Sequence, residues 1–352
     1  MEKSISFETC PEELREEIVL RSPLKSLAKL VGVSRKWSSI IRGEDFKARY
    51  LSLSKERPRV LLAAAEIIKL LPDSAATEEE EEVWLSVMFR SVYQEEEPLL
   101  SSGLQEIRVR VLGATSFRAC QPIRGVICLH FTTNEIVIFN PCTGKSQTLP
   151  DIQADANHFL VSFFGYDETR DVFKVLCMAL DGPFGDRPRE AQILTCKGGQ
   201  ESVVMSFNMS SEEFTAVQVP EGVNFRGGWS LVKYKKKIAL SRMVDHNNGE
   251  LQLWVRKATG GWSSERFVIP DWKDTVGNTR FHFKGTVGKS ILVFYQVSIV
   301  KDSRSTSLLY FDKSTQRLRR YDFQDLYDAP PLKLPYPAVQ LFLDHCDSTW
   351  LL

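Results

Sequence analysis

The residues that most often carry out chemistry in proteins are few in this chain and stand far apart. The five histidines show no H-E-x-x-H or other ligand spacing, so the sequence predicts no zinc site. The nearest His/Cys pair is His345-Cys346, and adjacent strand residues point to opposite faces, which argues against a catalytic dyad. The histidines are His130, His158, His246, His282 and His345.

No other catalytic or cofactor-binding motif is present. The chain has no G-x-S-x-G elbow, no phosphate-binding loop and no dinucleotide fingerprint, and its carboxylates show no acid–base spacing. The seven cysteines include no C-x-x-C pair, which is typical of reduced structural thiols. We therefore expect no catalytic residue, no cofactor and no metal; the rival hypothesis, a hydrolase with clustered carboxylates, predicts turnover by the purified chain alone.

Composition narrows the class of protein further. The chain has 352 residues, of which 43% are hydrophobic, enough for a large core. Lys+Arg and Asp+Glu both number 45, so no global basic field favours nucleic acid as a partner. No signal peptide and no apolar stretch of membrane-spanning length is recognised, so we expect no membrane partner and a cytoplasmic and/or nuclear location.

The chain divides into regions of different periodicity. Residues 11–51 have the spacing of helices, whereas residues from about 104 onward have the pattern of short strands separated by turns. Between them, "RPRVLLAAAEIIKLL" suggests a strand that continues into a helix, Glu78–Glu82 a solvated loop, and "VWLSVMFRSV" a strand. We predict an α-helical module at 7–51, a connecting segment at 52–103 and an all-β domain at 104–352.

A weak repeat marks the β-region. Strands end in an aromatic residue, a polar turn follows, and a second strand begins. In four cases an Asx residue directly follows the aromatic, and its side chain can accept backbone N–H groups and close the turn. The repetition favours an irregular β-propeller over the alternative, a β-sandwich, and gives an α+β fold overall. The four Asx residues are Asn140, Asp167, Asn208 and Asp312.

The first segment should form three short helices. Pro11 and Pro23 suit helix starts, and Ser34 suits an N-cap ahead of Trp37. Helices of this length are not stable alone, and a module of about 40 residues buries too little to hide all its apolar positions. Some of them should stay exposed and bind another protein, unless the helices dock on their own β-domain.

The segment "CPEELREEIVLRSPLKSLAKLVGVSRKWSSIIRGEDF" resembles the plant F-box. It departs from that family at Cys10 and Ser22, where apolar residues are usual, and at Gly32. The matching positions are Pro11, Leu14, Ile18, Pro23, Leu24, Lys25, Ser26, Leu27, Val33, Ser34 and Trp37.

The β-region is similar to the plant F-box-associated domain. The similarity rests on "PIRGVICL", "VIFNPCTGKSQTLP", "FFGYDETRDVFKVLCM", "LQLWVRKATGGWSSERFVIP" and the final "LFLDHCDSTWLL". Between "QILTCKGGQ" and "VVMSFNMSSEEF" the family normally has one or two more strands, including an Asn-Gly hairpin. The resemblance therefore implies a shortened β-domain here. In that family a glycine is also common at the position of Lys236, within the basic cluster "KYKKK".

These resemblances imply the substrate-receptor subunit of a Skp–cullin–F-box ubiquitin ligase, which is not itself an enzyme. A Skp-type adaptor, and through it cullin and a RING subunit, would bind the F-box, and a protein substrate would bind the β-domain. The alternative is a non-ligase β-propeller that binds protein or glycan and has a degenerate F-box. The expected adaptor-binding residues are Pro11, Leu14, Ile18, Pro23, Leu24, Leu27, Leu30, Val33, Ser34 and Trp37.

The substrate surface is expected on loops between strands, where aromatic and arginine side chains often form binding hot spots. The candidate residues, which we expect to be exposed, are Phe225, Arg226, Trp229, Trp272 and Arg280.

Overall fold

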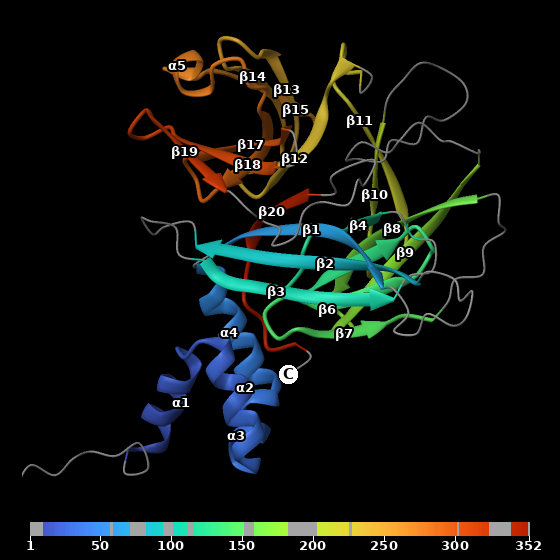
Figure 1. Ribbon diagram of the computed structural model, residues 1–352. Coiled ribbons are helices and arrows are strands. Elements are labelled where there is room, and N and C mark those ends of the chain that lie inside the picture. Colours follow the sequence, from blue (N-terminus) through green and yellow to red (C-terminus); the bar gives the residue numbers. More distant parts are fainter. Residues whose placement is uncertain are drawn as a thin grey trace, which may run out of the picture. The chain divides into compact units, whose positions relative to one another are not determined.

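In the computed structural model the chain forms two compact units (Figure 1). The first contains residues 1–153, 162–164 and 332–352, and the second contains residues 154–161 and 165–331. The structure describes residues 10–56, 59–70, 82–93, 101–110, 114, 116–150, 158–181, 203–224, 227–300, 303–323 and 339–350.

The first unit begins with helices, as the sequence predicts. Pro11 and Pro23 each occupy the N-cap position of the helix that follows, and the Ser34 side chain accepts a hydrogen bond from the Trp37 N–H, so this predicted cap is confirmed. A fourth helix follows the three that were expected. The helices are α1 (Glu12–Leu20), α2 (Leu24–Val33), α3 (Arg35–Arg42) and α4 (Glu44–Glu56).

Two antiparallel four-stranded sheets make up the rest of the first unit. One has the order β20-β1-β2-β3, so the last strand of the chain pairs with the first one, with His345 opposite Arg59. The other has the order β4-β5-β6-β7. The strands are β1 (Arg59–Leu70), β2 (Glu82–Tyr93), β3 (Ser101–Arg110), β4 (Phe117–Ala119), β5 (Ile127–Phe131), β6 (Ile136–Asn140), β7 (Lys145–Thr148) and β20 (Val339–His345).

The expectation of a helix at the end of "RPRVLLAAAEIIKLL" is wrong, because residues 59–70 of this segment form strand β1. Its residues pair one by one with β2, from Arg59 opposite Tyr93 to Leu70 opposite Glu82. The alanines that suggested a helix are buried in the core, where pairing on both edges of the strand outweighs helix propensity. Of the expected acidic loop, Glu82 begins β2, and residues 78–81 lie outside the described residues.

A single apolar core joins the two sheets of the first unit. It combines β1 and β2 side chains such as Leu61 and Phe89 with Phe131 and Phe139 from β5 and β6. The rings of Phe89 and Phe139 lie 4.9 Å apart between centroids, within the range of favourable aromatic pairs. The two sheets thus stack face to face, as neighbouring blades of a propeller do.

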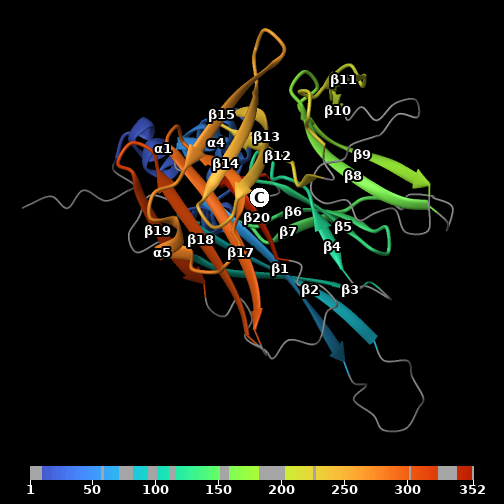
Figure 2. The ribbon, with the colours of Figure 1, turned by 90° about the horizontal axis from the view of Figure 1, so that it is seen from above.

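The second unit contains an eight-stranded sheet of order β15-β14-β13-β12-β16-β17-β18-β19, seen from above in Figure 2. It consists of two antiparallel four-stranded halves, which meet where Lys233 of β12 pairs in parallel with Gly285 of β16. Its elements are β12 (Ser230–Tyr234), β13 (Lys237–Asp245), β14 (Glu250–Arg256), β15 (Trp262–Val268), α5 (Trp272–Val276), β16 (His282–Val287), β17 (Ile291–Val300), β18 (Ser303–Asp312) and β19 (Arg317–Phe323).

Two hairpins precede this sheet. They are β8 (His158–Asp167) with β9 (Val172–Asp181), and β10 (Val203–Phe207) with β11 (Phe214–Gln218). Side chains connect their turns, because the Lys174 ammonium bonds the Met209 carbonyl at 2.7 Å and Glu212 at 2.6 Å. Ser210 donates to Asp167 at 2.8 Å. The place where the resembled family has one or two more strands lies between residues 200 and 203, and residues 182–202 lie outside the described residues.

All four predicted Asx turns are confirmed. The side-chain oxygen of each residue accepts the backbone N–H two residues on: Asn140 from Cys142 at 2.9 Å, Asp167 from Thr169 at 3.0 Å, Asn208 from Ser210 at 2.9 Å and Asp312 from Ser314 at 2.9 Å. Each turn joins two paired strands. The repeat recognised in the sequence is therefore a repeated hairpin.

The fold class is confirmed: short N-terminal helices precede a large, propeller-like all-β region of antiparallel hairpins and sheets. In the part of the chain that the structure describes, none of the helices has both the length and the apolar composition needed to cross a bilayer.

Substitution of two glycines in the first unit tests how closely residues 346–348 pack against Gly125. Gly125 and Gly144 both have left-handed φ values, 78° and 71°, but a Cβ on Gly125 would lie 2.5 Å from the Cys346 carbonyl oxygen, whereas Gly144 faces open space. We expect Gly144→Ala to lower the unfolding free energy by about 1–2 kcal/mol. Gly125→Ala should cost about 1–3 kcal/mol more, because the added methyl group also clashes.

Urea unfolding followed by tryptophan fluorescence measures both changes. Equal losses for the two variants would show that residues 346–348 do not pack on Gly125 in solution.

Candidate functional site

The N-terminal helices have a small core of their own. The fully buried members include Leu27 and Ile41, with Phe46 and Tyr50 contributed by α4. The Tyr50 hydroxyl donates to the Ser22 carbonyl at 3.4 Å, which holds the turn between α1 and α2 against α4. Leu30 and Trp37 are partly buried against this core.

Three apolar side chains of the same helices stay exposed. Leu14 and Ile18 of α1 are 54% and 48% exposed, and Val33 at the end of α2 is 79% exposed. Leu14 and Ile18 are four residues apart and therefore share one face of α1. The expectation that these helices leave part of their apolar surface uncovered is met at these three positions.

The structure sorts the ten expected adaptor-binding residues into three groups. Leu24 and Leu27 are buried core residues, and Leu30, Ser34 and Trp37 are half-buried. The other five are exposed, and contact with an adaptor stays a prediction for all ten. The exposed residues are Pro11, Leu14, Ile18, Pro23 and Val33.

An open depression of about 400 Å³ lies where α2 meets α3. Sequence reasoning named Val33 and Ser34 of its lining but missed Arg35 and Arg42, which supply its only charges. The signal that could have found them is helical spacing, because Arg35, Ser38, Ser39 and Arg42 recur three or four residues apart on α3. The depression thus combines an apolar rim with positive charge.

Ion pairs fix the orientation of α1 on its neighbours. Lys36 of α3 bonds Glu12 of α1 at 2.7 Å, and the hydrogen bond and charge of Lys36 lower the pKa of Glu12. Arg49 of α4 reaches Glu17 of α1 at 3.4 Å. These pairs connect α1 to α3 and α4, but they are exposed and therefore contribute little to stability.

Two of the expected substrate-binding residues are buried in the structure. Trp229 and Trp272 were expected to be exposed, and this is wrong: they are 7% and 2% exposed. Trp272 packs against Phe281 and Phe294 and donates its indole N–H to the His246 carbonyl at 2.8 Å. Gly249 permits this burial, because a Cβ there would lie 2.6 Å from the indole.

Arg280 is exposed, so its role in substrate binding stays a prediction. Phe225 and Arg226 lie outside the described residues.

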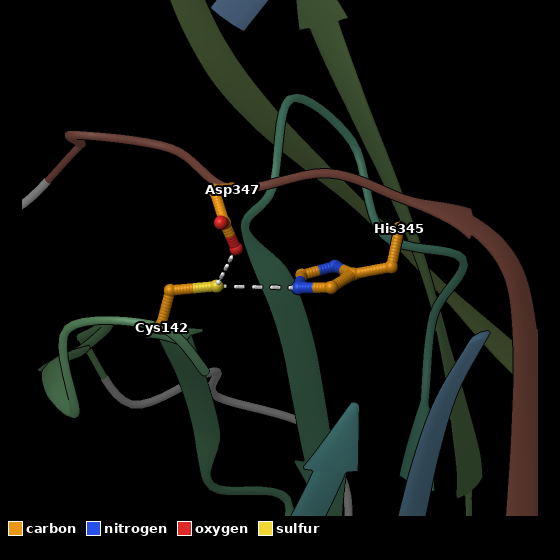
Figure 3. Close-up of side chains that lie close together, drawn as sticks. All are labelled: Cys142, His345 and Asp347. Carbon is orange, nitrogen blue, oxygen red and sulfur yellow. Dashed lines mark hydrogen bonds between the residues drawn. The ribbon is translucent and has the colours of Figure 1, made fainter. Parts of the chain in front are cut away.

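Three side chains from two distant parts of the chain meet in the first unit (Figure 3). The Cys142 thiol, in the turn after β6, donates to Asp347 Oδ1 at 2.9 Å and lies 3.4 Å from His345 Nε2. Asp347 also accepts from Arg59 at 2.7 Å, and its backbone N–H donates to Ser54 of α4 at 2.6 Å. The cluster therefore connects α4, the start of β1, the β6–β7 turn and the end of β20.

These three residues could hold a metal ion, since their ligand atoms lie within 4.8 Å of one another. The sequence argument from local spacing missed the group, because Cys142 and His345 are 203 residues apart. The charges do not favour a cation, however. The buried Arg59 guanidinium already pairs with Asp347, so a divalent ion bound to the Cys142 thiolate and to Asp347 would leave uncompensated positive charge in the protein interior.

The cluster is also poorly suited to nucleophilic catalysis. Burial, and then the charge of Asp347, raise the pKa of Cys142 well above its ordinary value, so the thiol stays protonated. Burial lowers the pKa of His345 to about 4, so its imidazole is a weak base. We interpret the cluster as a structural connection between the helices and the end of the chain.

The low pKa of His345 predicts a pH-dependent stability. The pKa in the folded state, about 4, lies below the ordinary value near 6.5, so the unfolded chain takes up the proton first as the pH falls. The unfolding free energy should therefore fall between about pH 6.5 and pH 4, by up to roughly 3 kcal/mol from this group. Urea unfolding measured across this range should show a shallower slope for His345→Gln than for the wild type.

Wild type and His345→Gln are compared in the same buffers, because the other groups that titrate in this range are common to both chains. An unchanged slope in His345→Gln would contradict the burial of a neutral imidazole.

Comparison with known proteins identifies both parts of the chain. Residues 7–49 match the F-box domain. Residues 75–203 and 196–346 match the F-box associated beta propeller domain, in two overlapping segments.

Relatives match over the full length. F-box protein At1g70970 of Arabidopsis thaliana is 37% identical over 422 positions, covering 100% of both chains, and At1g70960 is 36% identical over 391 positions, covering 99% of each. F-box/kelch-repeat protein At3g04660 of the same organism is 27% identical, covering 97% of this chain and 93% of its own. The chain belongs to the family of F-box proteins with an F-box associated beta propeller domain.

Proposed function

We propose that this chain is the substrate-receptor subunit of a Skp–cullin–F-box ubiquitin ligase. The N-terminal helices bind a Skp-type adaptor, and the β-region binds a protein substrate. Family membership supports the class of protein, and one observation carries the adaptor assignment: Leu14, Ile18 and Val33 remain exposed on a module that has otherwise formed its core.

The exposed surface has the character of a protein interface. Apolar side chains of this size each contribute about 1.5–3 kcal/mol when a partner buries them. The depression at the α2–α3 junction adds Arg35 and Arg42 at its lining, with no carboxylate among its lining residues. An adaptor that completes this surface should present apolar side chains surrounded by acidic ones.

The chain breaks no bond in this function. It holds a substrate near the conjugating enzyme that the rest of the ligase recruits, and so raises the effective concentration of the acceptor lysine. A fixed geometry between the helices and the sheet that follows them serves this role. The Ser54–Asp347 and Arg59–Asp347 bonds give such a connection within the first unit.

The exposed apolar residues provide the test of adaptor binding. In pull-down or calorimetric titration of the full chain with a purified Skp-type adaptor, Ile18→Asp and Val33→Asp should each weaken binding by at least about tenfold, because each puts a charge where an apolar side chain is to be buried. Neither change should lower the unfolding free energy by more than about 0.5 kcal/mol, since both sites are exposed. Leu27→Asp is a poor test, because Leu27 is fully buried and its loss would unfold the helices.

Val172→Asp is the matched control: Val172 is an exposed valine on β9 of the second unit, and its change should leave adaptor binding intact. Full adaptor binding by both Ile18→Asp and Val33→Asp would place the interface elsewhere. A wild-type chain that binds no adaptor would overturn the receptor proposal and favour the non-ligase β-propeller binder.

A further inference from the structure

The turn between β12 and β13 carries lysines in an unfavourable backbone conformation. Lys235 and Lys236 have φ values of 49° and 64°, so both central residues of this tight hairpin are left-handed. Asn and Gly are the residues preferred in such turns, and a side chain with a Cβ costs roughly 1–2 kcal/mol at each position. Strain of this kind is found most often at functional sites.

Lys235 of this turn meets Lys313 over a buried tyrosine, and Lys236 of the same turn is exposed. Tyr234 is fully buried, and the Lys235 and Lys313 ammonium groups lie 4.8 Å and 5.4 Å from the centroid of its ring. Lys313 also donates to the Tyr234 hydroxyl at 3.1 Å and lies 5.1 Å from the Phe267 ring. We call Lys235, Lys236 and Lys313 the lysine corner.

The lysine corner has more positive than negative charge. The nearby carboxylate, Glu265, accepts the Tyr234 hydroxyl at 2.7 Å and lies 4.0 Å from Lys235. Asp312, next to Lys313 in the chain, is already bonded by the N–H and hydroxyl of Ser314. Burial, and then the charge of Lys235, lower the pKa of Lys313, while the charge of Glu265 acts in the opposite direction.

The backbone holds the corner in place. The Lys235 N–H donates to Thr286 Oγ1 of β16 at 2.7 Å, which ties the turn to the neighbouring half of the eight-stranded sheet. A rigid support lowers the entropy lost when a ligand binds. The backbone of the corner is thus held in place, and its ammonium groups outnumber the carboxylates beside them.

We propose that the lysine corner binds an acidic segment of a substrate protein, with one or two carboxylates of the segment between Lys235, Lys236 and Lys313. This inference rests on the proposed receptor function and names the chemistry of its substrate. A short acidic peptide fits better than a polyanion, because the chain has 45 basic and 45 acidic residues and so no general field to attract a nucleic acid.

Fluorescence anisotropy with the full-length chain and a labelled hexaglutamate peptide tests the proposal. The wild type should bind this peptide and not the equally labelled hexaglutamine, and binding should weaken as salt rises. Lys313→Met, which keeps the apolar stem over Tyr234, should weaken binding by about tenfold, the effect of one charge-assisted hydrogen bond.

Lys236→Gly gives the sharpest readout, since it should weaken peptide binding and raise the unfolding free energy together. A residue with only a structural role would not show this opposition. Lys257→Met is the control, because it removes an exposed charge from the β14–β15 turn and should change neither measurement.

Undiminished binding in Lys313→Met and Lys236→Gly would overturn the proposal, and so would equal binding of a labelled hexauridylate. Adaptor binding of the same variants separates this inference from the receptor function. If the adaptor binds and the peptide does not, only the proposal of acidic-segment binding at the lysine corner is contradicted. If the peptide binds through the lysines and the adaptor does not, the receptor function falls.

Discussion

The first unit depends on how the end of the chain holds its beginning. Strand β20 pairs with β1, and the residues after it contact α4: Asp347 accepts Arg59 and bonds Ser54, and the Lys47 ammonium lies 5.7 Å from the Trp350 ring. Four short helices have too little core to stand alone, so they need this support. Because the support reaches them through α4, the opposite elements α1 and α2 are left free to expose Leu14, Ile18 and Val33.

The sequence left two alternatives for the helices: docking on their own domain, or binding a partner. In the structure α4 contacts the end of the chain while Leu14, Ile18 and Val33 stay exposed, so docking through α4 does not exclude a partner at the exposed residues. Helices α1–α3 were predicted because their apolar residues have helical spacing and each helix begins after a proline or serine N-cap. The hairpins were predicted from their Asx turns, which the sequence can show because the interaction is local and spans two or three residues. The prediction of a helix at the end of the β1 segment was wrong because strand pairing, with residues as distant as His345, outweighs the local helix propensity.

The same contrast applies to the candidate sites. Exposure of Leu14 and Ile18 follows from counting apolar residues against available core, whereas burial of Trp272 depends on the close approach of Gly249 from another turn. The Cys142–His345–Asp347 cluster joins residues more than 200 positions apart, so no spacing rule could detect it. The lysine corner was visible only as a basic turn, until the structure placed Lys313 beside it.

Side chains connect two hairpins that share no backbone hydrogen bonds in the described part of the chain. The alignment with At1g70970 runs over 422 positions, so that relative has segments that this 352-residue chain lacks, and the family match is split at residues 196–203. In the described part of the chain, hairpins β8–β9 and β10–β11 flank that position as separate two-stranded sheets. Lys174 bridges them through the Met209 carbonyl and Glu212, and its charge is balanced by Asp167 at 3.0 Å. The two hairpins are thus connected through one buried carboxylate, Asp167, and one lysine, Lys174.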